Sequence, residues 1–85
     1  MTDQKSIEQD VRNFIVSNFL FGADNGLTPE QSLLSTGIMD STGVLELVAF
    51  LEQTYQIKVA DQELVPENLD SITRVGAFVT RKQGR

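Results

Sequence analysis

The chain has 85 residues, of which 40% are hydrophobic, and a formal net charge of −5 at pH 7. This length gives room for one small domain with one modest core. The chain contains neither cysteine nor histidine, which excludes disulfides, thiolate chemistry, the usual Ser-His pairing and the commonest zinc ligand. We therefore expect no metal site and no enzymatic activity, and a reducing cytoplasm is the expected location.

Charge is distributed unevenly along the chain. Residues 21–73 contain nine acids and one base, Lys58, whereas the tail from Arg74 onward contains four bases and no acid. An acidic middle argues against a nucleic-acid partner and favours basic protein surfaces. A charge that only keeps copies of a soluble domain from associating is an open alternative. The longest apolar run, Leu47 to Leu51, is far too short to span a membrane, and the amphipathic residues 1–15 do not resemble a signal peptide.

The first predicted element is a helix from about Asp3 to Phe19, with Gly22 as its stop. Its inward face carries the apolar residues of one helical stripe, Ile7, Val11, Phe14 and Ile15. The following connection, residues 22–40, is too long to lack structure in a compact domain. Within it, residues 28–31 read Thr-Pro-Glu-Gln, the order of a capping box, and predict one short turn. We expect four apolar side chains to pin this loop to the core: Leu27, Leu33, Leu34 and Ile38.

A second long helix is predicted from Ser41 to Tyr55. Its buried stripe follows the helical repeat: Val44, Leu47, Val48, Leu51 and Tyr55. Residues 57–59 alternate in polarity, but a lone strand has no partner, so an extended linker is expected there. A short turn is predicted at residues 61–64, before Pro66.

The last predicted helix covers about Thr73 to Lys82 and places four apolar residues inward: Ile72, Val75, Phe78 and Val79. Its basic end suits the negative pole of its own dipole. The pattern predicts an all-α fold, a small antiparallel bundle of three principal helices. We expect one domain over residues 1–85, with a core at 3–82 and a tail at 83–85.

Asp40-Ser41 stands where the second helix is predicted to begin. A helix N-terminus offers unpaired backbone N–H groups and a positive dipole end, which favour an attached phosphate. Serine is also a common N-cap, so an ordinary cap is the competing interpretation of Ser41. Asp70-Ser71 repeats the dipeptide before a helix that contains Arg74 and no acid, and we predict a capping or turn role for Ser71.

Nearly the whole chain resembles the acyl carrier proteins, which have a first helix, a long loop, Asp-Ser, an acidic second helix, a short third helix and a fourth helix. Ser41 matches the serine that carries a 4'-phosphopantetheine arm, Asp40 matches the residue before it, and residues 46–48 match a common Glu-Leu-Val run. The resemblance implies a four-helix bundle, a covalent 4'-phosphopantetheine cofactor on Ser41, and cargo held as a thioester. No histidine is present to activate Ser41, which agrees with modification by a separate enzyme.

The resemblance also implies partners: a phosphopantetheinyl transferase that uses coenzyme A and magnesium, a ligase that loads an acyl or aminoacyl group, and downstream enzymes of a specialised biosynthetic pathway. We expect four residues of the second helix to contact partners: Thr42, Leu45, Glu46 and Glu52. Leu45 is expected to act as an apolar contact beside the arm, and the two glutamates to face basic surfaces or to form a solvated helix face. Phe50 is expected to be buried against the long loop or the third helix. A monomer without nucleic-acid binding or membrane insertion is expected.

Two departures keep alternatives open. Thr42 and Gly43 stand where many fatty-acid carriers have leucine and an acid, and glycine weakens a helix by up to about 1 kcal/mol relative to alanine. A glycine here resembles D-alanyl carriers, so an aminoacyl carrier is an alternative. Residues 59–72 are longer than in fatty-acid carriers, and this segment borders the cargo in that family. A third alternative is an unmodified acidic helical adaptor that binds a basic protein.

Overall fold

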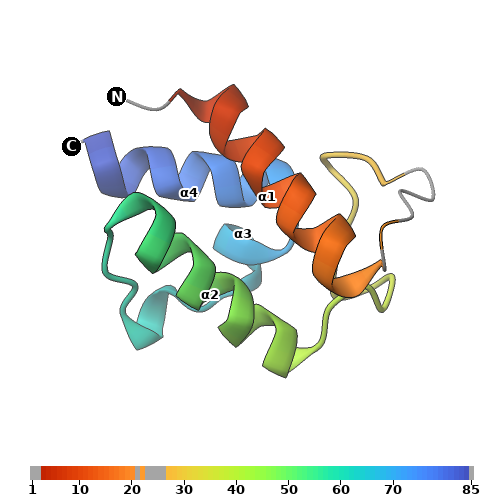
Figure 1. Ribbon diagram of the computed structural model, residues 1–85. Helices are drawn as coiled ribbons and strands as arrows, with labels where there is room; N and C mark the ends of the chain where they lie inside the picture. Colours follow the sequence, from red (N-terminus) through yellow and green to blue (C-terminus); the bar gives the residue numbers. More distant parts are fainter. Residues whose placement is uncertain (1–2, 21, 23–26, 85) are drawn as a thin grey trace.

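The computed structural model describes residues 3–20, 22 and 27–84, which form helices and turns without a strand. The elements in chain order are α1 (Gln4–Phe19), α2 (Ser41–Tyr55), the 3-10 turn η1 (Asp61–Glu63), α3 (Pro66–Leu69) and α4 (Ile72–Gly84). In Figure 1, α1 and α2 run in roughly opposite directions, and α3 lies between α2 and α4. The predicted all-α bundle of three principal helices and a short third helix is confirmed.

Helix α1 begins and ends as its sequence predicts. The Asp3 carboxylate caps it by accepting a hydrogen bond of 2.8 Å from the Ser6 N–H. After the helix, Gly22 has a φ of 87° and donates its N–H to the Val16 carbonyl at 2.9 Å. Glycine adopts this left-handed conformation without strain, and the bond closes the end of the helix. Three side chains of α1 are fully buried: Ile7, Val11 and Ile15.

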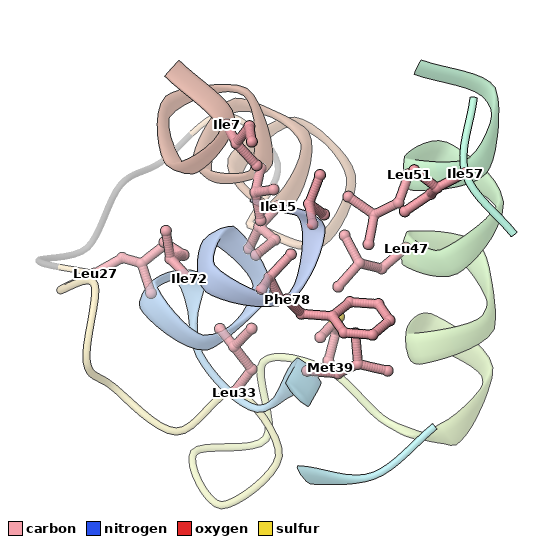
Figure 2. Packing of buried hydrophobic residues seen from close by; sticks show 14 residues of the cluster. Ile7, Ile15, Leu27, Leu33, Met39, Leu47, Leu51, Ile57, Ile72 and Phe78 are labelled. Atoms are coloured by element: carbon pink, nitrogen blue, oxygen red, sulfur yellow. The ribbon is translucent and has the colours of Figure 1, made fainter. Parts of the chain in front are cut away.

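Helix α4 contributes the centre of the core, with α1 and α2 on either side of it (Figure 2). Phe78 is 2% exposed and extends from α4 toward Leu47 of α2. Among the described elements, α1 and α4 make the most extensive contact. They approach closely at Gly76, where a Cβ atom would lie 2.6 Å from Cγ of Glu8. This glycine therefore leaves room for the Glu8 side chain of α1 to pack against the backbone of α4.

The loop before α2 follows the prediction in part. Leu27 and Leu33 are buried and Ile38 is partly buried, as expected, but the prediction for Leu34 is wrong because its side chain is 38% exposed. Leu33 occupies the core position, which leaves its neighbour at the surface. The Gln31 side-chain oxygen accepts a 3.2 Å hydrogen bond from the Thr28 N–H, which is half of the expected capping box, and the chain forms a turn there.

Helix α2 has the predicted bounds and buried stripe. Leu47 and Leu51 are fully buried, and the other stripe residues are partly buried: Val44, Val48 and Tyr55. Loss of either leucine side chain to alanine would cost about 2–5 kcal/mol. The prediction for Phe50 is wrong, because its ring stacks on Phe14 of α1 with centroids 4.5 Å apart instead of packing on the loop or the third helix. Phe50 lies on the side of α2 that faces α1, three residues after Leu47.

The segment between α2 and α4 begins at Gln56, whose backbone is left-handed (φ 56°), then runs without helix or strand over residues 57–60 and turns at η1. This confirms the predicted linker and turn. Pro66 starts α3 at a position where its missing N–H is not needed. Helix α4 starts one residue before the predicted position and continues to Gly84, two residues beyond Lys82.

Candidate functional site

The first turn of α2 is capped by Asp40. The backbone of Asp40 is extended, and its Oδ1 accepts a 2.8 Å hydrogen bond from the Gly43 N–H. The Asp40 carbonyl accepts a further bond of 2.9 Å from the Val44 N–H. Ser41 is therefore the first residue of the helix, and the competing interpretation of Ser41 as an ordinary N-cap is wrong.

The hydroxyl of Ser41 is available for chemistry. The residue is exposed, and its side chain has no hydrogen-bond partner in the part of the chain that the structure describes. Ser71, by contrast, is 4% exposed, and its Oγ accepts a 3.1 Å hydrogen bond from the Arg74 N–H. The predicted capping role of Ser71 is confirmed, and of the two Asp-Ser serines Ser41 is the accessible one.

Gly43 lets the end of α1 pack directly on this first turn. A Cβ atom at position 43 would lie 2.9 Å from Cε1 of Phe19 and 3.0 Å from Cγ of Met39. A separation below 3.0 Å is essentially never seen for a real Cβ atom, so a methyl group at position 43 would require Phe19 to shift and would press on Met39. The absence of a side chain at position 43 thus lets Phe19 of α1 pack against the Ser41 end of α2.

A pocket of about 300 Å³ lies beside Ser41. Apart from Ser41, its lining is apolar and comes from the loop, α2, and the segment that leads into α3: Leu34, Val44, Leu45, Leu64, Val65, Pro66 and Leu69. Leu34 and Leu45 are 38% and 58% exposed, and they are the large hydrophobic side chains that the described surface leaves open. The pocket can hold a small apolar group next to the Ser41 hydroxyl.

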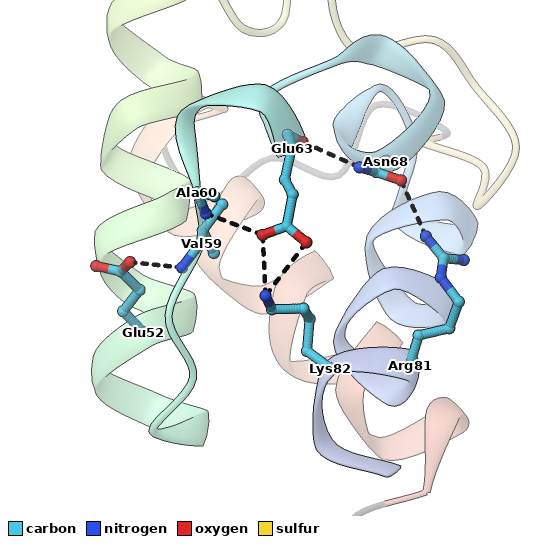
Figure 3. Close-up of polar contacts among 7 residues, drawn as sticks. All are labelled: Glu52, Val59, Ala60, Glu63, Asn68, Arg81 and Lys82. Atoms are coloured by element: carbon cyan, nitrogen blue, oxygen red, sulfur yellow. Dashed lines mark hydrogen bonds and ion pairs between the residues drawn. The ribbon is translucent and has the colours of Figure 1, made fainter. Parts of the chain in front are cut away.

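The residues expected to contact partners differ in their exposure and in their distance from Ser41. Thr42, Leu45 and Glu46 are exposed in the first two turns of α2, where positions three or four apart share a face. Glu52 lies 11 residues after Ser41, about 16 Å from it along the helix axis at a rise of about 1.5 Å per residue. It is partly buried, and its carboxylate accepts a 2.9 Å hydrogen bond from the Val59 N–H (Figure 3).

Glu63 fixes the segment that leads into the α3 wall of the pocket. Its Oε1 accepts hydrogen bonds of 2.9 Å from the Ala60 N–H and from Nζ of Lys82 in α4 (Figure 3). The bond from the Ala60 backbone, followed by the bond from Lys82, lowers the pKa of the Glu63 carboxyl. Asn68 of α3 accepts a further bond of 2.9 Å from Arg81, so α4 holds both η1 and α3.

The sequence pattern did not reveal the pocket walls. The pattern predicts Leu34 in the core, predicts Pro66 only as the stop of a turn, and gives no role to Val65 or Leu69. The available signal was Leu34 itself, because adjacent leucines in a turn cannot both face the core. Among the described residues, no group of three or more His, Cys, Asp or Glu could hold a metal ion. None of the described helices is long and apolar enough to cross a membrane.

Comparison with known proteins identifies relatives over most of the chain. A Serratia protein named "Probable acyl carrier protein PigG" is 32% identical over 75 residues, which cover 88% of this chain and 86% of the relative. An acyl carrier protein of Akkermansia muciniphila is 33% identical over 79 residues, which cover 93% and 95%. A D-alanyl carrier protein of Streptococcus pyogenes is 32% identical over 56 residues, which cover 66% and 71%. No family model matches the chain. The relatives show that this protein is an acyl or aminoacyl carrier, and that it belongs to the acyl carrier protein family.

Proposed function

We propose that this chain carries its cargo on a 4'-phosphopantetheine arm attached to the hydroxyl of Ser41. The observation that carries the proposal is the state of this serine, which is exposed, without a side-chain partner among the described residues, and adjacent to an apolar pocket. Its position at the start of α2 suits an attached phosphate, because the backbone N–H groups of a first helical turn and the helix dipole favour negative charge.

The division of labour follows from the side chains available. When attached, the arm supplies the thiol that holds cargo as a thioester. The chain itself has no thiol, because it contains no cysteine. Ser41 supplies the attachment point, Asp40 fixes the turn that presents it, and Gly43 lets Phe19 pack behind that turn. A separate transferase activates the serine with its own base and magnesium, using coenzyme A as the donor.

Partner enzymes approach the surface around Ser41. Thr42, Leu45 and Glu46 are exposed around the attachment point. Leu45 beside the charged Glu46 suits an enzyme surface on which an apolar patch adjoins basic residues. The charge of Glu46 mainly affects how fast and how selectively partners associate. Glu52 is a contact at the edge of this surface, since it lies about three helical turns after Ser41. One of its oxygens already accepts the Val59 N–H, which leaves the other oxygen for a partner.

Two kinds of cargo are consistent with the family. An acyl group agrees with the names of the Serratia and Akkermansia relatives, and an aminoacyl group agrees with the name of the D-alanyl carrier relative. We favour an acyl or other apolar cargo of a specialised pathway, because the pocket beside Ser41 is lined by apolar side chains. Incubation of the armed protein with candidate acyl and amino-acid ligases, followed by intact mass, separates the two.

The attachment site is tested by intact mass before and after incubation with coenzyme A, magnesium and a broad-specificity phosphopantetheinyl transferase. We expect one phosphopantetheine on the wild type and on Ser71→Ala, and none on Ser41→Ala. Ser71→Ala is the matched control because it removes the other Asp-Ser serine, at a cost of about 1 kcal/mol for the lost cap. Circular dichroism checks that each variant is folded.

The opposite result would be equally clear. If folded wild-type protein carries no arm from its native source and gains none with several transferases, or if Ser41→Ala is still modified, the proposed attachment at Ser41 is wrong. Absence of any modification would favour the acidic adaptor, whose function would survive Ser41→Ala.

A further inference from the structure

Asp70, in the junction between α3 and α4, is bonded to three consecutive residues of the loop before α2. Its Oδ2 accepts a 2.7 Å hydrogen bond from the Ser32 hydroxyl, and its Oδ1 accepts a 2.9 Å bond from the Leu34 N–H. The backbone carbonyl of Asp70 accepts a 2.7 Å bond from the Leu33 N–H. Ser32 in turn accepts a 3.0 Å bond from the Ser35 N–H, so the carboxylate orders the whole turn.

The same residue connects two parts of the wall of the pocket beside Ser41. Leu34 belongs to the loop wall, and Leu69, the residue before Asp70, belongs to the α3 wall. Leu69 is 2% exposed and is held by the core, whereas Leu34 is 38% exposed and gains little from burial. The position of Leu34 therefore depends on the hydrogen bond that its backbone N–H donates to the Asp70 carboxylate.

We propose that Asp70 fixes the distance between these two walls, and so determines the size of the cargo group that can lie beside Ser41. This inference rests on the proposed function of Ser41 as the attachment point of the arm. It makes Asp70 a positioning residue for cargo selection, because Asp70 acts through Leu34 and is not itself part of the pocket lining.

Removal of the Asp70 carboxylate affects the wall more than the fold. In Asp70→Ala, the Leu34 N–H and the Ser32 hydroxyl lose their acceptor, so Leu34 is held less firmly, while the Leu33 N–H still donates to the backbone carbonyl of position 70. Other ties of the loop remain: Leu33 stays fully buried, and its carbonyl still accepts the 3.0 Å bond from the Met39 N–H. The loss of hydrogen bonds at a partly exposed site costs a modest part of the total stability.

The experiment uses four variants of the full chain. Asp70→Ala removes both side-chain bonds, and Asp70→Asn keeps one oxygen that can accept from the Leu34 N–H. Glu67→Ala removes the same charge from an exposed position on α3. Tyr55→Phe removes the 2.8 Å hydrogen bond to Asp10, which lies outside the pocket lining, and so controls for a general loss of stability.

Each protein is first armed with coenzyme A and the transferase, and attachment is checked by mass. In separate reactions, unmodified protein receives the arm as its acetyl or octanoyl thioester from acetyl- or octanoyl-coenzyme A, and cleavage of each thioester by hydroxylamine is timed. In the wild type we expect the octanoyl thioester to be cleaved more slowly than the acetyl thioester, because the pocket shelters the longer chain.

We expect Asp70→Ala to lower this octanoyl-to-acetyl protection ratio about tenfold, the factor that corresponds to about 1.4 kcal/mol. Asp70→Asn should give an intermediate ratio, whereas Glu67→Ala and Tyr55→Phe should keep the wild-type ratio. A wild-type ratio in armed, folded Asp70→Ala would overturn the inference, as would equal cleavage of both thioesters in the wild type. Failure of every protein to accept the arm would instead contradict the proposed function, and the inference would fall with it.

Discussion

At the scale of single residues, Gly43 shows a conflict between helix propensity and packing. Alanine would favour the helix by up to about 1 kcal/mol over glycine. The added methyl group would, however, lie 2.9 Å from the Phe19 ring and 3.0 Å from Met39, and overpacking typically costs about 1–3 kcal/mol. Because Met39 is 2% exposed and has little room to move, we expect the steric cost to exceed the gain in propensity.

We therefore predict that Gly43→Ala destabilises the protein by about 1 kcal/mol, measured by urea unfolding. The effect should shrink or reverse when Phe19→Leu is also present, because leucine lacks the ring atoms that the methyl group meets. This double-mutant cycle isolates the contact between the two positions. Additive effects of the two substitutions would show that Phe19 does not restrict position 43.

At the scale of helices and turns, sequence periodicity predicted the long helices that bury one face. Helices α1, α2 and α4 were found within about two residues of their bounds because their buried residues repeat with the helical period. Helix α3 has four residues, which is too few for a period, and its presence was expected from the family resemblance alone. Which neighbour Phe50 would contact depended on how α1 crosses α2, and no local pattern specifies that.

In the candidate site, too, the local feature was predictable and the long-range contacts were not. The dipeptide Asp40-Ser41 could be assigned to a helix start because capping is a local feature, and Ser41 is exposed at the start of α2 in the structure. The pocket walls come from segments about thirty residues apart, Leu34 and residues 64–69. They meet because Asp70 binds the loop by long-range hydrogen bonds, and bonds of this kind leave no periodic trace in the sequence.

The turn η1 provides a prediction about pH. Hydrogen bonds from the Ala60 N–H and Lys82 lower the pKa of Glu63 below its ordinary value of 4.5. A group whose pKa is lower in the folded state stabilises the fold above its unfolded pKa, and this contribution is lost as the pH falls through the folded pKa. Glu63→Gln should therefore be less stable than the wild type near pH 7.

The deficit of Glu63→Gln should decrease as the pH falls below 4.5 and vanish once Glu63 is protonated in the folded wild type. Urea unfolding midpoints of both proteins between neutral and acidic pH measure this. Glu67→Gln, which removes the same charge from exposed α3, controls for net charge. A deficit that is constant over the whole pH range would mean that Glu63 acts through packing and not through its charge.

At the scale of the whole molecule, the helices are not fastened equally. Helices α1 and α4 meet closely at Gly76 and share the most extensive contact among the described elements, whereas the contact between α2 and α4 is much smaller. Helix α2 is held mainly by side chains such as Leu47, Leu51 and the Phe14–Phe50 stack. Its first turn carries Ser41, at the end of the molecule away from the start of α1 and the end of α4 (Figure 1).

Regions with few contacts open at a lower free energy than the rest of a fold. We therefore predict that backbone amides in the first half of α2 exchange with deuterium at least about tenfold faster than amides in the middle of α1 and α4, since a tenfold change corresponds to about 1.4 kcal/mol. Residue-resolved exchange measured by NMR on the unmodified protein tests this, with the amides of Ile15 and Val79 as references because both side chains are fully buried. Such opening would let the Ser41 turn adapt to a transferase and then to other partners while the α1–α4 pair keeps the fold intact. Equal protection of Leu47 and Val79 would show instead that the molecule opens as one unit, and that partners must recognise the Ser41 surface as it stands.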